Sequence, residues 1–205
     1  MKNGFPQRNN SMNTVKWRYG AKESGSVQTV AGFYCLLFLG VFLYSQFQIF
    51  LFGASGMYLE DALAASNLAA AVADIEEYGA SHRVWISDVW EAYARYQTAV
   101  KENLQLNESW EGANPSLISG VVKIEQFIVY NVEGEAVQIS RISGSGEAQE
   151  EWGILGMVVT PEGTLVTHTG IYSEISFPVK GFAGITVQAR KGKFVDIVRE
   201  EGEEL

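Results

Sequence analysis

The stretch VAGFYCLLFLGVFLY, from Val30 to Tyr44, lies at the centre of a run that contains no Asp, Glu, Lys or Arg. The uncharged run begins at Ser24 and ends at Leu59. A helix needs about 20 mostly apolar residues to cross the roughly 30 Å hydrocarbon core of a bilayer. Val27–Ala54 would reach about 42 Å as a helix at about 1.5 Å per residue. The sequence therefore predicts a membrane-spanning helix near the N-terminus.

The charges on the two sides of this run differ in sign. Residues 1–23 carry five Lys or Arg and one Glu, a net charge of +4, which leaves −13 for the rest because the total is −9. Basic residues beside a spanning helix favour the cytoplasmic side. We therefore expect a single-pass protein of the cell membrane, with a cytoplasmic N-terminus and an extracytoplasmic C-terminal domain. The acidic outer region repels phosphate, so nucleic acid is not an expected partner.

The apolar run is expected to stay in the mature protein. It is much longer than the ~7–15 residue core of a cleaved signal peptide. Cys35, the only cysteine, lies inside the run, so the outer region must fold without an intrachain disulfide. We interpret Cys35 as a small apolar residue in lipid or at a helix contact.

An alanine-rich segment follows the apolar run. Met57–Glu77 reads MYLEDALAASNLAAAVADIEE, and alanine is the best helix former. The spanning helix is therefore predicted to continue outward, with Gly79 as its stop. A second, amphipathic helix is predicted to begin at an N-cap, Ser87 or Asp88, and to continue to Leu104, because apolar residues recur there at spacings of three and four.

From Ser119 onwards the apolar period changes to two, which is the period of a half-buried strand. Strands at Val122–Val132 and Ala136–Ile142 are predicted to form a hairpin around Glu133-Gly134. Ile142–Glu151 reads as a flexible connector. Two more turns are predicted, at Pro161-Glu162-Gly163 and at Lys191-Gly192-Lys193. The strands predicted beyond the connector are Ile154–Thr160, Thr164–Thr169, Ile171–Val179, Ile185–Arg190 and Phe194–Arg199.

The predicted fold class is α+β. It comprises a long N-terminal helix with a transmembrane half and an Ala-rich outer half, a second amphipathic helix, and a small antiparallel β-sheet of about five or six strands. The expected organisation is a cytoplasmic basic segment (1–24), a transmembrane helix (25–54), an extracytoplasmic helical region (55–118) and an antiparallel β domain with an acidic tail (119–205).

The sequence carries no recognisable catalytic motif. Its two histidines, His82 and His168, have no nucleophile or metal ligand at a familiar spacing. The glycine-rich Gly144-Ser145-Gly146 is followed by Glu147, Glu150 and Glu151, which would repel a phosphate. We therefore expect no enzyme activity, no catalytic or cofactor-binding residue, no metal site and no small-molecule substrate.

The order of segments resembles that of a type IV pilin-like subunit. Lys22-Glu23-Ser24-Gly25-Ser26-Val27 leads into the apolar helix, and Tyr58-Leu59-Glu60-Asp61-Ala62-Leu63 follows it. Among pilin-like proteins the chain most resembles the TadE-like pseudopilins of the tight-adherence (Flp) pilus system. The resemblance implies a non-enzymatic minor pilin or pseudopilin that helps to assemble such a pilus or a related secretion apparatus. It also implies membrane lipid, other pilin-like subunits and pilus platform proteins as partners.

The resemblance also suggests site residues. Pilin-like proteins are usually cut after a glycine, with a glutamate five residues into the mature chain. Gly25 is the candidate processing site, although Val30 stands where that glutamate is expected. Small side chains let helices approach closely, and in lipid such packing drives association. The candidate helix-packing interface on the alanine-rich helix consists of Ala64, Ala65, Ala69, Ala70 and Ala73. These alanines could instead pack on the protein's own sheet.

A second function remains open at this point. The outer region carries Trp85, Trp90, Trp110 and Trp152. Tryptophans pack cores and subunit contacts, and they also stack on ligands. A membrane-tethered extracytoplasmic ligand-binding or sensory module would use these side chains, or the loop Asn107–Pro115, to hold its ligand.

Overall fold

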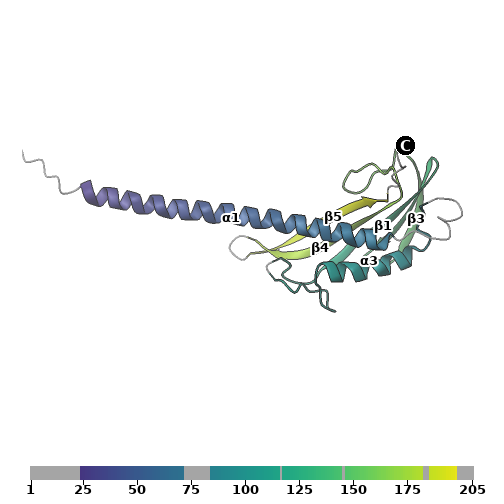
Figure 1. Cartoon of the computed structure of the whole chain (residues 1–205), viewed down its shortest axis with the longest axis horizontal. Helices are drawn as coiled ribbons and strands as arrows, with labels where there is room; N and C mark the ends of the chain where they lie inside the picture. The colour runs from purple at the N-terminus through teal and green to yellow at the C-terminus, as the bar shows by residue number, and fades with distance from the viewer. Residues whose placement is uncertain (1–23, 72–83, 116, 145, 182–184, 198–205) are drawn as a thin grey trace, which may run out of the picture. The chain divides into compact units, whose positions relative to one another are not determined.

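The computed structural model describes residues 24–71, 84–115, 117–144, 146–181 and 185–197. Within these ranges the chain is α+β, as predicted, with two helices and five strands (Figure 1). Their bounds are α1 Ser24–Ala70, α3 Val89–Asn103, β1 Lys123–Glu133, β2 Ala136–Ser143, β3 Ala148–Ile154, β4 Gly170–Lys180 and β5 Thr186–Asp196. The predicted helix stop at Gly79, the candidate residue Ala73 and His82 lie outside the described residues.

Helix α1 is 47 residues long and runs through Gly53 and Gly56 without interruption. The chain divides into two compact units between Phe47 and Gln48, so α1 contributes to both. We call Gln48–Ala70 the outer half of α1. This one helix is long and apolar enough to cross a membrane, as predicted.

The first unit presents its side chains to the surroundings. Every side chain from Gly25 to Tyr44 is exposed. Two of its hydroxyl groups bond within the helix: Thr29 Oγ1 donates to the carbonyl of Gly25 at 2.7 Å, and Ser45 Oγ donates to that of Val41 at 2.9 Å. Such bonds lower the cost of placing a hydroxyl in hydrocarbon, where water is absent. The segment is therefore suited to an apolar solvent.

The second unit is built on one antiparallel sheet with the strand order β3-β2-β1-β4-β5. The predicted turn at Gly134 joins β1 to β2, and its φ of +59° is a conformation that favours glycine. The pairing of β1 with β4 shifts register between Ile124 and Gln126. Strands β3 and β5 form the two edges, and β3 is exposed along almost its whole length and carries Glu150 and Glu151.

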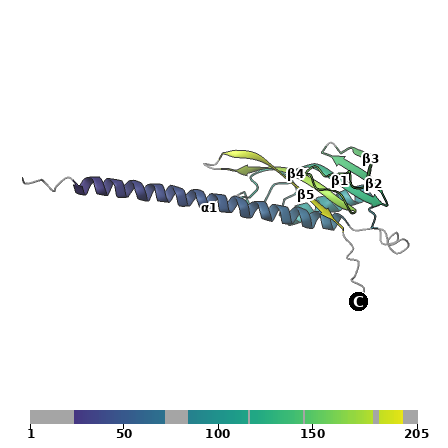
Figure 2. The same cartoon turned by 90° about the horizontal axis from the view of Figure 1, so that it is seen from above.

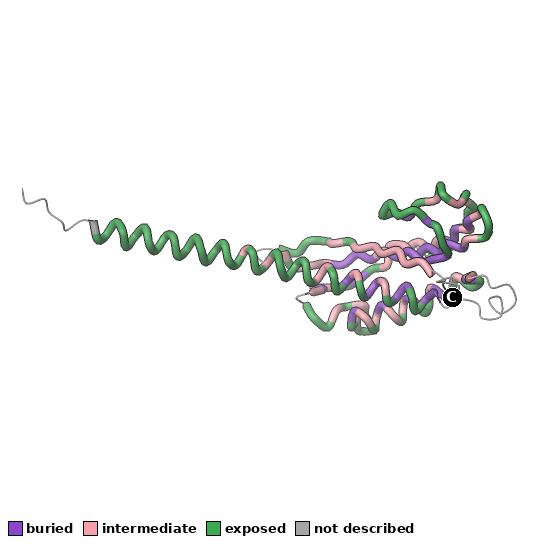
Figure 3. The backbone as a smooth tube through the Cα atoms, turned by 45° about the horizontal axis from the view of Figure 1, so that its top comes forward, coloured by how far each residue is buried: buried purple, intermediate pink, exposed green. Residues whose placement is uncertain are grey.

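The outer half of α1 and helix α3 pack on one face of this sheet, and Figure 2 shows α1 along that face. Side chains alternate along a strand, so Phe127 and Val129 of β1 face the helices. Helix α3 begins at the predicted cap, where the side chain of Asp88 accepts a hydrogen bond from Glu91 N at 2.9 Å. Buried residues of both helices and the strands meet in this layer (Figure 3).

The opposite face of the sheet has a smaller core. Ile128 and Tyr130 of β1 point to this side, together with Tyr172 of β4. The chain between β3 and β4, residues 155–169, covers them with the buried side chain of Val166 and the partly buried Leu155 and Val158. We call residues 155–169 the covering segment.

Two of the predicted β features are wrong in detail. The predicted connector Ile142–Glu151 contains most of β3, because an edge strand that is exposed on both faces needs no apolar alternation. The predicted hairpin at 154–169 is much shorter than expected. Val159 and Leu165 form one antiparallel bridge around the predicted turn, with hydrogen bonds from Thr160 N to the carbonyl of Thr164 and from Val166 N to that of Val158, and the rest is irregular chain of the covering segment.

The predicted turn at Lys191-Gly192-Lys193 is also wrong. Strand β5 runs straight through these residues, which pair with Ile175, Glu174 and Ser173 of β4. The chain reverses earlier, where Gly181 N donates to the carbonyl of Ile185 at 2.7 Å. An alanine at position 192 would place its Cβ 2.3 Å from the hydroxyl of Tyr172, so glycine serves a close approach here.

Candidate functional site

The outer half of α1 is held to the sheet and to α3 by a buried apolar seam. Leu63 is fully buried, and Leu59 and Ala70 are buried beside it. They join one core cluster with Tyr96 and Val100 of α3. Burying an aliphatic side chain of this size contributes about 2 kcal/mol. The outer half of α1 is thus an integral part of the β domain.

Asn67 adds a polar contact inside this seam. Its side chain is fully buried, and its Nδ2 donates to the carbonyl of Lys193 at 2.8 Å and to that of Ile171 at 3.4 Å. A buried amide that bonds to two strands fixes the position of the helix, because losing those bonds would leave buried carbonyls unpaired.

A second polar contact joins α1 to α3. The hydroxyl of Tyr58 donates to the carbonyl of Asn103 at 2.6 Å. The amide of Asn103 donates in turn to Ser66 Oγ at 3.0 Å, and Ser66 Oγ donates to the carbonyl of Ala62 at 2.7 Å. The last turn of α3 is therefore tied to two turns of α1.

Glu60 forms an ion pair with the edge strand of the sheet. Its two carboxylate oxygens accept hydrogen bonds from Lys193 Nζ at 2.8 Å and from Lys191 Nζ at 2.9 Å. These hydrogen bonds and the positive charges behind them lower the pKa of Glu60 from 4.5 to about 2. The same hydrogen bond raises the pKa of Lys193. One carboxylate thus neutralises part of the charge of β5 next to the helix.

The candidate alanines fall on different faces of α1. Ala65 and Ala69 are exposed, Ala64 is half-buried, and Ala70 is buried against the sheet. Leu68 lies on the same exposed side and shows 54 % of its surface. Residues spaced by three and four share a helix face, so we call Ala65, Leu68 and Ala69 the exposed strip of α1. Gly25 lies in the first unit, in the first turn of α1, and is exposed.

A shallow groove runs beside the exposed strip, between α1 and α3. It has a volume of about 450 Å³. Small residues make up most of its lining, which also includes the Glu91–Arg95 ion pair of α3. The residues that line it are Ala69, Glu91, Ala94, Arg95, Thr98, Ala99 and Glu102.

The tryptophans do not converge on one site. Trp90 is half-exposed on α3 and contacts Tyr93, whereas Trp152 is exposed on the edge strand β3. Trp110 lies in the loop after α3, and Lys101 Nζ lies 5.1 Å from its ring centre. Its φ of +63° is unusual for so large a residue.

Trp110 borders a second cavity, of about 460 Å³, at the junction of α3 and β1. Tyr93 is the other aromatic residue there, and Gln97, Lys123 and Glu125 supply polar groups. Burial raises the pKa of Tyr93, so its hydroxyl is neutral at physiological pH. An aromatic wall with a few polar groups is a common feature of ligand sites.

An exposed apolar patch on the covering segment was missed in the sequence, because the spacing of its residues does not differ from that of core residues. We call Met157, Val159 and Leu165 the distal apolar patch, and each exposes 45 % or more of its surface. Trp152 and Ile154 of β3 are also exposed, but they alternate with Gly153, which faces Val158 of the covering segment, so they point to the other face of the sheet. Exposed apolar clusters often mark protein contacts.

The residues that the structure describes hold no cluster of three His, Cys, Asp or Glu side chains that could bind a metal ion. His168 Nδ1 lies 3.0 Å from Thr167 Oγ1 and 3.7 Å from a carboxylate oxygen of Asp196, at the exposed end of the sheet.

Comparisons with known proteins return no match, whether with family models, with curated proteins or with solved structures. The architecture is therefore the main guide to function. A long N-terminal apolar helix whose outer half packs against an antiparallel sheet is a pilin-like architecture.

Proposed function

We propose that the chain is a non-enzymatic, single-pass membrane subunit of the minor pilin or pseudopilin type. It would serve the assembly of a tight-adherence-type pilus or a related secretion apparatus. The observation that carries the proposal is α1 itself, because one uninterrupted helix is exposed, uncharged and mostly apolar over Gly25–Tyr44 and becomes part of a folded domain from Leu59 onwards. One helix thus contains both the apolar segment and residues that pack in the core of the domain.

The orientation follows from charge. The basic residues before Ser24 would stay in the cytoplasm, and the acidic domain would be extracytoplasmic. Protease added to intact cells should remove the domain and leave a protected fragment of α1. A domain that resists protease in intact cells, but not in lysed cells, would contradict this orientation.

The exposed strip and the neighbouring groove are the surface we assign to partner subunits. Alanine side chains at positions 65 and 69 allow another helix to approach closely, and the groove beside them is lined by three small and three charged residues of α3. The buried Ala70 is not part of this surface, because it packs in the core.

Replacing Ala65 and Ala69 with leucine tests this surface. Both positions are exposed, so the domain should stay folded, while the added bulk should prevent close helix contact. We expect co-purification with pilus components to fall at least tenfold. Ala148→Leu, an exposed alanine on β3, is the control that should leave assembly unchanged. Normal fibres in the double variant would refute the assigned surface.

The rival function is a membrane-tethered ligand-binding module, and the cavity beside Trp110 favours it. Trp110 and Tyr93 would stack on a flat ligand, and Gln97 and Glu125 would bond to its polar groups. Trp110→Ala would then abolish saturable binding of a glycan panel to the detergent-solubilised chain without altering co-purification with pilus components. Loss of assembly with no glycan binding would favour the pilin-like function instead.

A further inference from the structure

The β4–β5 hairpin ends in an apolar tip. We define the hairpin tip as residues 179–181 and 185–187. Val179 pairs with Val187, and Lys180 pairs with Thr186. Ile185 exposes 66 % of its surface and Val187 exposes 53 %. Two large aliphatic side chains at the end of a hairpin are costly in water, which suggests that something covers them in the working protein.

The charges around the tip are unusual for so acidic a domain. Between Glu174 and Arg190 the only charged residue is Lys180, and it is exposed. The tip therefore combines apolar side chains with one positive charge and no negative charge. This combination suits the boundary between acyl chains and anionic headgroups.

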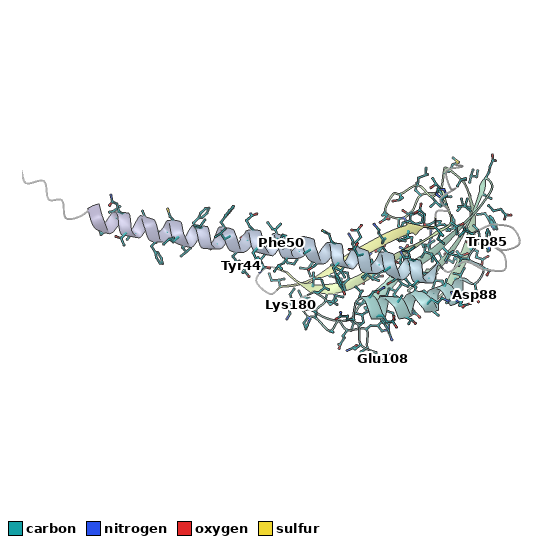
Figure 4. All side chains as sticks on the ribbon, viewed as in Figure 1. Tyr44, Phe50, Trp85, Asp88, Glu108 and Lys180 are labelled. Carbon is teal, nitrogen blue, oxygen red and sulfur yellow. The ribbon has the colours of Figure 1, made fainter. Side chains whose placement is uncertain are left out.

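The tip lies at the end of the unit where α1 leaves it. Figure 4 shows Lys180 near Phe50 and far from Trp85 and Asp88, which mark the opposite end of the same unit. The apolar side chains also face the side of the sheet on which α1 lies. Alternate residues of a strand share a face, and Phe177 and Ala189 of the same strands belong to the helix-facing core.

The length of α1 sets the level of the membrane. If the spanning segment starts at Val27, about 20 residues bring it to the region of Gln46. The next residues, up to Phe52, would then cross the outer headgroup layer, and Phe50 exposes 70 % of its surface there. Lys180 of the hairpin tip lies near Phe50 in the same unit (Figure 4), so a headgroup layer at the level of Phe50 would also reach the tip.

We propose that the hairpin tip is a second membrane contact, with Ile185 and Val187 at the acyl boundary of the outer leaflet and Lys180 on lipid phosphates. The inference rests on the membrane anchoring given under the proposed function. Two contacts, the helix and the hairpin tip, would limit how far the domain can tilt and would present the exposed strip of α1 in a constant direction.

Site-specific quenching tests this contact. The full-length chain with Cys35→Ser is reconstituted in vesicles of phosphatidylcholine and phosphatidylglycerol, and one fluorophore is attached to Val187→Cys. Some of the lipid carries a nitroxide on its headgroup or on its acyl chain. We expect the headgroup nitroxide to remove most of the emission at position 187. Val159→Cys, which is similarly exposed at 58 % but lies on the covering segment, should keep its emission.

A label at Leu39→Cys separates this inference from the proposed function. Quenching at position 39 by the acyl nitroxide, without quenching at 187, would overturn the hairpin contact and leave the anchor intact. No quenching at either position would refute the anchor itself. Emission at 187 that shifts to the blue but is not quenched by lipid would mean a protein cover, such as a second copy, and would also overturn the proposal.

A charge at the tip gives an independent result. Ile185→Glu should lower the quenching of the label at 187 to the level seen at Val159, because a carboxylate is repelled by anionic lipid and expelled from the acyl boundary. Met157→Glu, on the distal apolar patch, should leave the quenching at 187 unchanged. Equal quenching with and without Ile185→Glu would contradict a contact made through the apolar tip.

Discussion

Glu60 shows how one residue can decide the path of a distant strand. The KGK sequence at 191–193 is typical of a turn, yet both lysines bind Glu60 from an extended strand. The partner lies 131 residues away in the chain from Lys191, so no local pattern could have revealed it. Asn67 is similar, since a single amide in an alanine-rich helix gives no sign that it will be buried on two strands.

Removing the Glu60 carboxylate should make the domain less stable near neutral pH. Its folded pKa of about 2 lies below the ordinary value of 4.5, so its contribution is present above pH 4.5 and is lost as the pH falls toward 2. In Glu60→Gln we expect a lower urea midpoint at pH 7 and little difference from the wild type at about pH 2. Denaturation in detergent, followed by near-UV circular dichroism, measures both values.

Glu150→Gln, an exposed carboxylate on β3, serves as the control for this experiment and should behave as the wild type at both pH values. If Glu60→Gln lowered the urea midpoint equally at both pH values, the ionised carboxylate would not be the cause. The loss of stability would then come from altered packing around position 60.

At the scale of elements, periodicity predicted those parts that have one buried and one exposed face. Helix α3, its Asp88 cap, and the β1–β2 hairpin were read correctly because their apolar spacing and turn glycine are local signals. Strand β3 was missed because both its faces are exposed. Strand β5 was wrongly predicted as two strands joined by a turn, because the lysines that suggested the turn are paired with Glu60 of α1. The distal apolar patch was missed because exposure of an apolar residue depends on what the fold leaves uncovered.

Leu63 and Leu68 of α1 offer a matched pair at this scale. Leu63 is fully buried against the sheet, whereas Leu68 exposes 54 % of its surface. Leu63→Ala should cost about 3 kcal/mol in the free energy of unfolding because it leaves a cavity. Leu68→Ala should change that free energy by no more than about 0.5 kcal/mol. Chemical denaturation followed by tryptophan fluorescence would show the difference, and equal effects would mean that the packing of α1 is not as described.

At the scale of the whole molecule, the uncharged run predicted the main feature of the protein, a helix able to span a membrane. The charge pattern predicted the orientation of this helix in the membrane, and that orientation stays a prediction. What the sequence could not supply was the face of α1 that stays exposed. Which alanines are exposed depends on the seam between α1, α3 and the sheet, and that seam is visible only in the fold.

Charges placed in the centre of the apolar segment should release the protein from the membrane. Leu36→Arg and Phe38→Arg each oppose insertion by about 3 kcal/mol at the centre of a spanning helix. We expect the double variant to be found mainly in the soluble or aggregated fractions after membrane flotation. Trp152→Arg with Ile154→Arg, at exposed positions of β3, should float with the membranes as the wild type does.

An anchored protein meets copies of itself at high local concentration, and a sheet with an uncovered border is then prone to ordered aggregation. Here the border formed by β3 carries Glu150 and Glu151 at adjacent positions, so carboxylates stand on both of its surfaces. Two such borders would repel each other before their backbones could bond. In a protein anchored as proposed, the glutamates that obscure this strand in the sequence would therefore hinder pairing between two β3 borders in the plane of the membrane.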